Sequence, residues 1–519
     1  MRDQGMGRWA SRRALIEGDR VALESKSRRV SYAEFDVRTN RVANGLYRQG
    51  VRFGDRVAML LFNSVEFMEV LFGCAKLGAI AVPINFRLAS AEVAYLLGDS
   101  GAVVFVASGR LFEVAAAAMQ VEGVNVRELY LVGDSPAEWS DAVMPFEALL
   151  KDAAADPRDE EVNLGDVAML MYTSGTTGRP KGAMLTHGNM VWNAINMLGR
   201  LTGLSHDDRS VTAAPMFHIG GLGVFTLPLF YLGASNYLLE TFSPRETLDL
   251  MAKERATGMF LVPAMWAAIA QVEDFDSYDL GSLRFGISGG APCPLTVIEF
   301  FQSKGINFLE GFGMTETSPV VSVLAAEDVK SKAGSIGRVC MHVDARIVDE
   351  EDRDCETGTV GELLLMGPNI FKGYWGLPAA SAEALKNGWF HTGDLGRIDA
   401  EGFITLVDRK KDMIITGGEN VYPIEVEQVL FRHPGIQDVA VIGVKDERWG
   451  ETVVAVVVAR DADAIDPDEV IFFARERLAH FKAPTRVEVV SELPRNATGK
   501  ILKRELRVRF AGDASSVSR

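Results

Sequence analysis

A glycine- and hydroxyl-rich stretch, MYTSGTTGRPKG, occupies residues 171–182 and includes the cationic Lys181. An apolar run at 167–173 predicts a strand that ends at this loop. Backbone N–H groups and hydroxyls with little side-chain bulk suit polyphosphate oxygens, although composition alone also fits a flexible surface loop. A Walker P-loop would need Gly at Pro180 and Ser or Thr at Gly182. The stretch therefore predicts a phosphate loop of another kind, which disfavours a kinase or a GTPase.

A second pattern, GISGG at 286–290, matches the GxSxG nucleophile elbow with Ser288 at its centre. The HIGG sequence at 218–221 lies upstream, as an esterase oxyanion motif would. In a true elbow the serine leads directly into a helix, whereas Pro292 and Pro294 delay the next helix here. A serine hydrolase using Ser288 is therefore the weaker alternative, and it leaves the threonine-rich loop unexplained.

Short apolar runs alternate with amphipathic stretches along most of the chain, which predicts an α/β fold with layered subdomains. Ser31 is followed three positions later by Glu34, so a capping box should begin a helix that continues to about Tyr47. The expected strands are 57–62, 102–107, 167–173, 259–263 and 283–288, and further helices are expected up to Leu77 and near 90–97.

The pattern changes after about residue 390. Residues 402–423 predict two short strands around the basic residues Arg409, Lys410 and Lys411, followed by a unit of about 100 residues that reads as helix, strand, strand and helix. We therefore expect a large N-terminal domain at 1–408, a boundary at 409–412 and a small C-terminal α+β domain at 413–519.

Composition limits the classes of partner. The net charge of −16 disfavours general binding to nucleic acid or anionic membranes. The sequence contains no apolar run of 18 residues and no signal-peptide core. The four cysteines, Cys74, Cys293, Cys340 and Cys355, form no CxxC pair. These features predict a cytoplasmic protein without a membrane span; peripheral membrane contact stays open, and a homodimer is compatible with the sequence.

Seven motifs together resemble those of the adenylate-forming (AMP-binding) superfamily, in its acyl- and aryl-CoA ligase branch. They occur in the family's order and cover nearly the whole chain: YTSGTTGRPKG at 172–182, PMFHIGG at 215–221, GGAP at 289–292, GFGMTET at 311–317, WFHTGD at 389–394, DRKKDMIITGGENVYP at 408–423 and LPRNATGK at 493–500. The resemblance implies the adenylate-forming enzyme fold, in which 409–412 would be a hinge and the C-terminal domain would be mobile.

The implied reaction has two steps. A carboxylate attacks the α-phosphate of ATP and expels pyrophosphate, and the thiol of CoA then displaces AMP from the acyl-adenylate. Because two anions must approach each other, cations and backbone donors have to compensate their charge. The family pattern assigns catalysis to Lys500, Glu316, Thr173 and His218, with Glu316 as a ligand of Mg²⁺ and Lys411 as the hinge residue.

The same resemblance implies a nucleotide site. Asp394 and Arg409 would bind the ribose, Phe312 would stack on the adenine, and Thr315 would bond the α-phosphate. The other candidate ATP- and AMP-binding residues are Thr173, Ser174, Gly175, Thr176, Thr177, Gly178, Lys181, Gly290, Ala291, Pro292, Gly311, Gly313, Met314 and Lys500.

The acid and the thiol acceptor are less closely specified. His218 would separate the acyl pocket from the thiol channel, and a histidine there disfavours amino acid substrates. Apolar residues around it favour a neutral acid, either a fatty acid or an aryl acid of the feruloyl type, while a sterol fragment stays open. The candidate acyl-pocket residues are Phe217, His218, Leu222, Val224 and Val320, and the candidate CoA contacts are Gly417, Gly418, Trp449 and Lys482.

Overall fold

The computed structural model describes residues 4–134, 140, 142–158, 160–173, 179–410, 412–417, 419–446, 448–460, 465–495 and 501–511. The chain divides into two compact units, Met1–Ala345 with Leu365–Phe390, and Arg346–Leu364 with His391–Arg519. The second unit thus takes in residues on both sides of 409–412, and the hinge at that position stays a prediction. Within the described ranges, none of the helices is long and apolar enough to cross a membrane.

A seven-stranded sheet forms one layer of the first unit, in the order β7-β6-β5-β3-β4-β8-β9. Neighbouring strands from β7 to β8 pair in parallel, whereas β9 returns antiparallel to β8. The strands are β3 (Arg56–Leu60), β4 (Ile80–Pro83), β5 (Val104–Ser108), β6 (Glu128–Val132), β7 (Val143–Pro145), β8 (Val167–Thr173) and β9 (Lys181–Thr186). The helices of this part are α1 (Gly7–Glu17), α2 (Tyr32–Arg48), α3 (Val65–Leu77), α4 (Ser90–Ser100), α5 (Phe112–Met119) and α6 (Phe146–Leu150).

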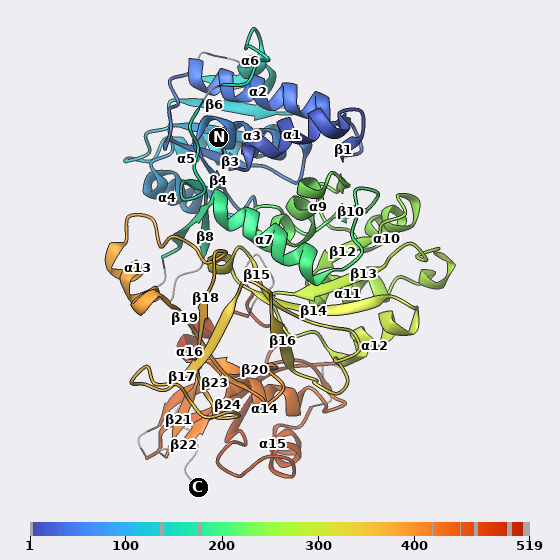
Figure 1. Ribbon diagram of the computed structural model, residues 1–519. Coiled ribbons are helices and arrows are strands. Elements are labelled where there is room, and N and C mark those ends of the chain that lie inside the picture. The colour runs from blue at the N-terminus through green and yellow to red at the C-terminus, as the bar shows by residue number, and fades with distance from the viewer. Residues whose placement is uncertain are drawn as a thin grey trace. The chain divides into compact units, whose positions relative to one another are not determined.

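The expected capping box is present at the start of α2. The Glu34 amide donates to the Ser31 hydroxyl at 3.2 Å, and the Ser31 amide donates to the Glu34 carboxylate at 2.8 Å. These two bonds satisfy backbone donors that the first turn of a helix leaves without intrahelical partners. Helix α2 packs on α3, which packs on β3 and β4 (Figure 1).

The second sheet of the first unit runs β16-β15-β14-β13-β12-β10-β11-β1-β2. Its parallel centre, β12 to β14, is drawn in yellow-green in Figure 1. The strands are β1 (Val21–Glu24), β2 (Arg29–Ser31), β10 (Arg209–Thr212), β11 (Ser235–Leu238), β12 (Gly258–Leu261), β13 (Phe285–Gly289), β14 (Asn307–Gly313), β15 (Val320–Leu324) and β16 (Ser335–Val339). The helices are α7 (His187–Arg200), α8 (Ile219–Gly221), α9 (Leu227–Leu232), α10 (Pro244–Lys253), α11 (Pro263–Ala270), α12 (Leu295–Ser303) and α13 (Pro378–Ala384).

Helix α7 connects the two layers, because it contacts β9 of the first sheet and β15 of the second (Figure 1). Its N-terminal turn is capped by Thr186, whose hydroxyl accepts from the Asn189 amide at 3.0 Å. Asn193, further along α7, accepts from the Val320 amide at 3.2 Å. The helix therefore fixes the start of β15 relative to the glycine-rich hairpin.

The second unit contains a run of four strands, β17-β18-β19-β20, and a separate sheet, β22-β21-β24-β23, in which β25 pairs with β24. Buried valines and isoleucines of β23 and β24 form cores on both faces of the separate sheet. The strands are β17 (Asp344–Val348), β18 (Gly361–Met366), β19 (Phe390–Ile398), β20 (Ile404–Arg409), β21 (Ile414–Thr416), β22 (Glu419–Val421), β23 (Ile436–Asp446), β24 (Gly450–Ala459) and β25 (Arg486–Val489). The helices are α14 (Pro423–Leu430), α15 (Pro467–Arg475) and α16 (Lys503–Phe510).

Candidate functional site

The glycine-rich stretch closes a β-hairpin. Strand β8 ends at Thr173 and β9 begins at Lys181, and these two residues face each other in the antiparallel register. Two residues of helix α4, Tyr95 and Asp99, bond to the two sides of the glycine-rich stretch. The Tyr172 hydroxyl donates to Asp99 at 2.7 Å, and the Tyr95 hydroxyl donates to the carbonyl of Pro180 at 3.1 Å. Burial raises the pKa of Tyr172, so its phenol stays a donor at neutral pH. The two ends of the predicted phosphate loop are thus fixed by the fold.

Residues 372–375 form a short additional edge on β9. The Met184 amide donates to Gly373 and the Lys372 amide donates back to Met184, both at 2.9 Å. The Trp375 amide donates to the Gly182 carbonyl at 2.8 Å. A segment almost 200 positions away in sequence is thereby aligned with the C-terminal side of the loop.

Glu316, the predicted metal ligand, is buried in the 3-10 turn Thr315–Thr317. The Tyr374 hydroxyl donates to its carboxylate at 3.0 Å, and the Phe371 amide donates to its backbone carbonyl at 2.9 Å. The Lys181 ammonium lies 5.1 Å from the centre of the Tyr374 ring. One tyrosine therefore contacts both residues: its hydroxyl bonds to Glu316, and its ring lies near the Lys181 ammonium.

The candidate nucleotide residues of the first unit lie at the ends of β13 and β14: residues 290–292 follow β13, residues 311–313 end β14, and residues 314–315 follow β14. These strands are parallel, with Gly289 opposite Gly311, so both segments emerge at the same edge of the sheet. A Cβ on Gly313 would lie 1.8 Å from the Pro319 carbonyl oxygen, and Gly290 has a φ of +87°. Both positions require glycine. Residues 290–292 and 311–315 retain accessible surface, as a ligand site outside the carboxyl ends of strands requires.

Ser288 does not have the environment of a hydrolase nucleophile. It lies within β13 with 1% of its surface exposed, and α12 begins only at Leu295. Among the described residues, no histidine forms a hydrogen bond to its hydroxyl. A nucleophile elbow would expose the serine and continue directly into a helix.

His218 begins the short helix α8, where its Nδ1 accepts from the Gly220 amide at 3.3 Å. The side chain keeps accessible surface, but the surrounding protein disfavours the charged form and lowers the pKa of His218. Phe217 packs edge-on against Phe86 with ring centroids 5.2 Å apart. Three other candidate acyl residues lie in the interior: Leu222, Val224 and Val320.

Sequence reasoning missed Phe260, which lies in the central strand β12 and is only partly buried. A Cβ on Gly220 would come within 2.9 Å of its ring, and a Cβ on Gly289 within 3.2 Å. The glycines therefore make room for this aromatic ring between the His218 turn and the end of β13. A partly accessible aromatic ring in a central strand is a candidate surface for a ligand, but only the folded arrangement shows that it lies between these two glycines.

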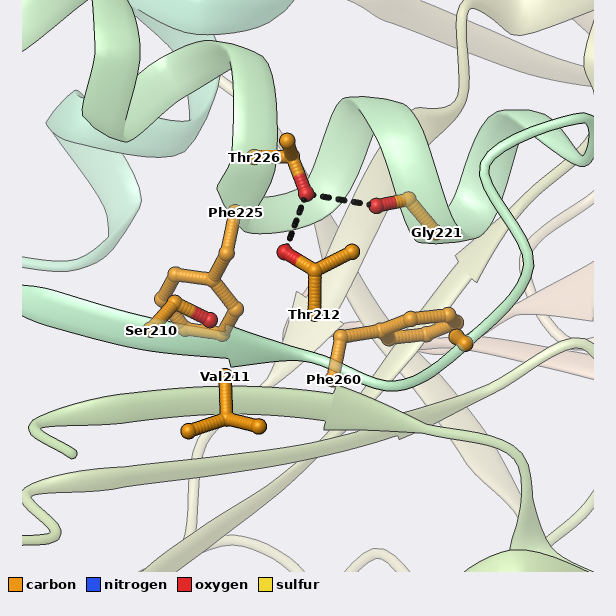
Figure 2. A pocket seen from close by; sticks show the side chains of 8 residues that line it. Ser210, Val211, Thr212, Gly221, Phe225, Thr226 and Phe260 are labelled. Carbon is orange, nitrogen blue, oxygen red and sulfur yellow. Dashed lines mark hydrogen bonds between the residues drawn. The ribbon is translucent and has the colours of Figure 1, made fainter. Parts of the chain in front are cut away.

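Behind Phe260 lies a cavity of about 10 Å³, shown in Figure 2. The Thr226 hydroxyl contacts the Gly221 carbonyl and the Thr212 hydroxyl, each at 2.8 Å. These bonds brace the π-helical segment Leu222–Thr226, which continues from α8. The volume would hold about one water molecule. The wall behind the candidate acyl residues is therefore tightly packed and partly polar.

In the second unit, the two candidate ribose residues are paired. Asp394 lies opposite Arg409 across β19 and β20, and the Arg409 Nε is 2.9 Å from the Asp394 carboxylate. Asp394 is buried, whereas Arg409 is partly exposed. The ion pair places a guanidinium beside the buried carboxylate and orients it, which suits an acceptor for two ribose hydroxyls.

The candidate CoA residues differ in their contacts within the protein. The Gly417 amide donates to the Trp449 carbonyl at 2.8 Å, and a Cβ on Gly417, whose φ is +59°, would lie 3.0 Å from the half-exposed indole. Lys482 instead forms an ion pair with Glu425, with 2.8 Å to each carboxylate oxygen. Lys482 would have to exchange this partner before it could bind a phosphate.

Several predicted residues lie outside the part of the chain that the structure describes. They are Ser174, Gly175, Thr176, Thr177, Gly178, Lys411, Gly418 and Lys500.

Comparison with known proteins assigns the family. Residues 10–375 match the AMP-binding enzyme model, and residues 425–500 match the AMP-binding enzyme C-terminal domain. A feruloyl-CoA synthase from Amycolatopsis sp is 44% identical over 98% of this chain and 100% of that protein. An indoleacetate–CoA ligase from Aromatoleum aromaticum is 39% identical over 97% of each chain. The o-succinylbenzoate coenzyme A synthetase from Bacillus subtilis, solved in complex with ATP and magnesium ion, has a TM-score of 0.85 at 32% identity and covers 96% of this chain and 98% of its own.

The chain belongs to the AMP-binding enzyme family of adenylate-forming CoA ligases. It is an ATP-dependent, AMP-forming acid–CoA ligase, as the motif order predicted, and the expectation of a mixed α/β fold is confirmed. The serine hydrolase alternative is thereby excluded.

Asp408, next to Arg409, is a buried carboxyl group of the second unit whose pKa depends on its surroundings. Its carboxylate accepts from the Ile424 amide at 3.0 Å and the Arg409 amide at 2.6 Å. Burial raises the pKa of Asp408 to about 6, while the Lys503 ammonium opposes the rise. Because this pKa exceeds the ordinary value, the folded state binds the proton more tightly, and the group's contribution to stability is lost as pH rises from about 4 to about 6.

We expect a ¹³C-carboxyl NMR titration of Asp408 to show a midpoint near 6, and Lys503→Met to move the midpoint higher because a compensating cation is lost. Arg507→Met is the matched control, since Arg507 pairs with Asp412 at 2.7 Å. A wild-type midpoint near 4, or no change in Lys503→Met, would contradict the assignment.

Proposed function

We propose that this ligase activates an apolar aryl acid, of the hydroxycinnamate type, and that its first half-reaction uses Mg²⁺·ATP. The observation that carries the choice of acid is Phe260, a partly buried aromatic ring that packs between Gly220 and Gly289. Phe217, Phe86 and Phe62 extend the aromatic surroundings, with neighbouring ring centroids 5.2 and 4.6 Å apart. Flat rings pack well on such surfaces, and the neutral form of His218 adds no charge.

The relatives support the same substrate class. The feruloyl-CoA synthase and the indoleacetate–CoA ligase are named for aryl acids, and both match almost the full length of this chain. A protein that shares their family and an aromatic surrounding for the acid would favour a planar ring over a flexible alkyl tail.

Magnesium fits the residues of the first unit. Within the described ranges, no three His, Cys, Asp or Glu side chains gather to form a metal cage. Mg²⁺ rarely needs one, because it binds through one or two carboxylates together with substrate phosphates and water. The buried Glu316 carboxylate would supply the protein oxygen. When bound, the ion would compensate negative charge on the phosphates.

Other residues of the chain would bind the phosphates, the adenine, the ribose and the acid carboxylate. Lys181 and Thr173 flank the phosphate loop, the residues after β13 and β14 would hold the adenine and α-phosphate, and the Asp394–Arg409 pair would orient the ribose. Lys500 would place a cation between the acid carboxylate and the α-phosphate. This arrangement would lower the repulsion between two anions that must come into line.

The substrate proposal is tested with a panel of acids. Purified protein is given ATP, Mg²⁺, CoA and one of ferulate, cinnamate, indoleacetate, hexanoate or palmitate, and both the nucleotide product and the CoA thioester are measured. We expect AMP and pyrophosphate, with kcat/KM for the aryl acids about tenfold or more above the fatty acids, a difference of about 1.4 kcal/mol. Palmitate as the best acid would contradict the aryl assignment, and ADP as the product would contradict the reaction class.

The hinge proposal is tested by separating the half-reactions. Proline at position 411 would fix φ near about −65° and block one of two hinge states. Lys411→Pro should retain much of the pyrophosphate-forming step but lose most thioester formation from supplied acyl-adenylate. Lys500→Ala should lose the first step and retain the second, because it removes only the cation needed for adenylation. Equal losses of both steps in each variant would refute the alternation of two domain states.

A further inference from the structure

Tyr374 is the one residue assigned no role so far that contacts both Glu316 and Lys181 in the described part of the chain. Its hydroxyl donates to a Glu316 carboxylate oxygen at 3.0 Å, and its ring carries the Lys181 ammonium 5.1 Å from the centroid. We propose that Tyr374 is a positioning residue: its hydroxyl orients Glu316 for the metal, and its ring orients Lys181 toward the phosphate loop. The inference rests on the proposed role of Glu316.

The tyrosine is itself held in place on two sides. Its backbone pairs with Ala183 in an antiparallel bridge, and its amide donates to the Ser381 hydroxyl at 2.8 Å. Its ring packs edge-on against Phe371, with centroids 4.9 Å apart, and Phe371 in turn packs against Phe390 at 5.3 Å. A ring fixed by backbone pairing and by aromatic neighbours can impose a direction on the groups that contact it.

The Tyr374 hydroxyl is a suitable hydrogen-bond donor to a carboxylate that also binds a metal ion. A carboxylate has two oxygens with about four acceptor sites, so one bond from a phenol leaves capacity for a cation. Glu316 is the middle residue of a short 3-10 turn, and its side chain is buried. A fixed donor helps to set the direction of its carboxylate, and partners of this kind commonly change metal affinity about 10- to 100-fold.

The Tyr374 ring can restrict the orientation of the Lys181 side chain. A flexible four-carbon stem gives Lys181 many orientations, and an aromatic face attracts the ammonium without neutralising its charge. The cation therefore stays available to a phosphate while its direction is restricted. One side chain would thus couple the metal ligand to the loop cation, which act on the same polyphosphate in the proposed reaction.

The two contacts can be separated by substitution. Tyr374→Phe removes only the hydroxyl and keeps the ring under Lys181, whereas Tyr374→Leu removes both. Tyr130→Phe is a matched control, because the Tyr130 hydroxyl donates to the Glu128 carboxylate at 2.7 Å in strand β6, which is separated from β9 by four strands of the same sheet. Binding of Mn²⁺ to the full-length protein with a non-hydrolysable ATP analogue is measured by electron paramagnetic resonance, and metal-free analogue binding by calorimetry.

We expect Tyr374→Phe to weaken Mn²⁺ binding about tenfold, with metal-free nucleotide binding within twofold of wild type. Tyr374→Leu should weaken both, because Lys181 also loses its support. Tyr130→Phe should match wild type in both measurements. Wild-type Mn²⁺ affinity in Tyr374→Phe would overturn the proposal.

A parallel Glu316→Ala measurement distinguishes failure of the inference from failure of its basis. If Glu316→Ala weakens Mn²⁺ binding and Tyr374→Phe does not, Glu316 is a ligand and Tyr374 does not position it. If Glu316→Ala also leaves Mn²⁺ binding unchanged, the proposed metal role of Glu316 fails, and the role of Tyr374 fails with it.

Discussion

The pairing of residues 372–375 with β9 is the constraint on which the candidate site of the first unit depends. Three backbone bonds, all of 2.8 or 2.9 Å, align this segment with the C-terminal side of the glycine-rich hairpin. Because Tyr374 lies within it, its hydroxyl meets Glu316 and its ring meets Lys181. Backbone pairing is directional and insensitive to side-chain identity, so it can hold a charged arrangement that side-chain forces alone would not bring together.

Burial and charge then set the protonation states around the site. The surrounding protein lowers the pKa of His218, and Asp394 is buried beside its Arg409 partner. Asp408, the residue before Arg409, is buried as well, and burial raises its pKa to about 6 although the Lys503 ammonium opposes the rise. The two carboxylates of the second unit have different partners: a guanidinium contacts Asp394, whereas backbone amides donate to Asp408.

The sequence predicted those features that depend on local pattern. Strand β8 was expected at 167–173 and occupies Val167–Thr173. The apolar run sets the extent of the strand, and the Ser-, Gly- and Thr-rich stretch that follows marks its end. The Ser31 cap was also confirmed, because its signal lies within four residues.

The site residues that were missed depend on contacts between distant parts of the chain. Tyr374 is one of ten tyrosines, and nothing near it in sequence indicates a partner 58 positions earlier. Phe260 becomes informative only when Gly220 and Gly289 are seen on either side of its ring. Motifs identified the reacting groups, but the residues that orient them are set by tertiary packing, which one sequence does not display.

In the proposed reaction, acyl-adenylate would form when Mg²⁺ held by Glu316, together with Lys181, compensates the charges of the carboxylate and the triphosphate. Exchange of labelled pyrophosphate into ATP, measured without CoA, reports that step alone. The exchange should require both a suitable aryl acid and Mg²⁺, and it should fall on the order of 100-fold in Glu316→Ala, because charge compensation in the transition state is lost. Exchange in Glu316→Ala equal to that of wild type would contradict the account.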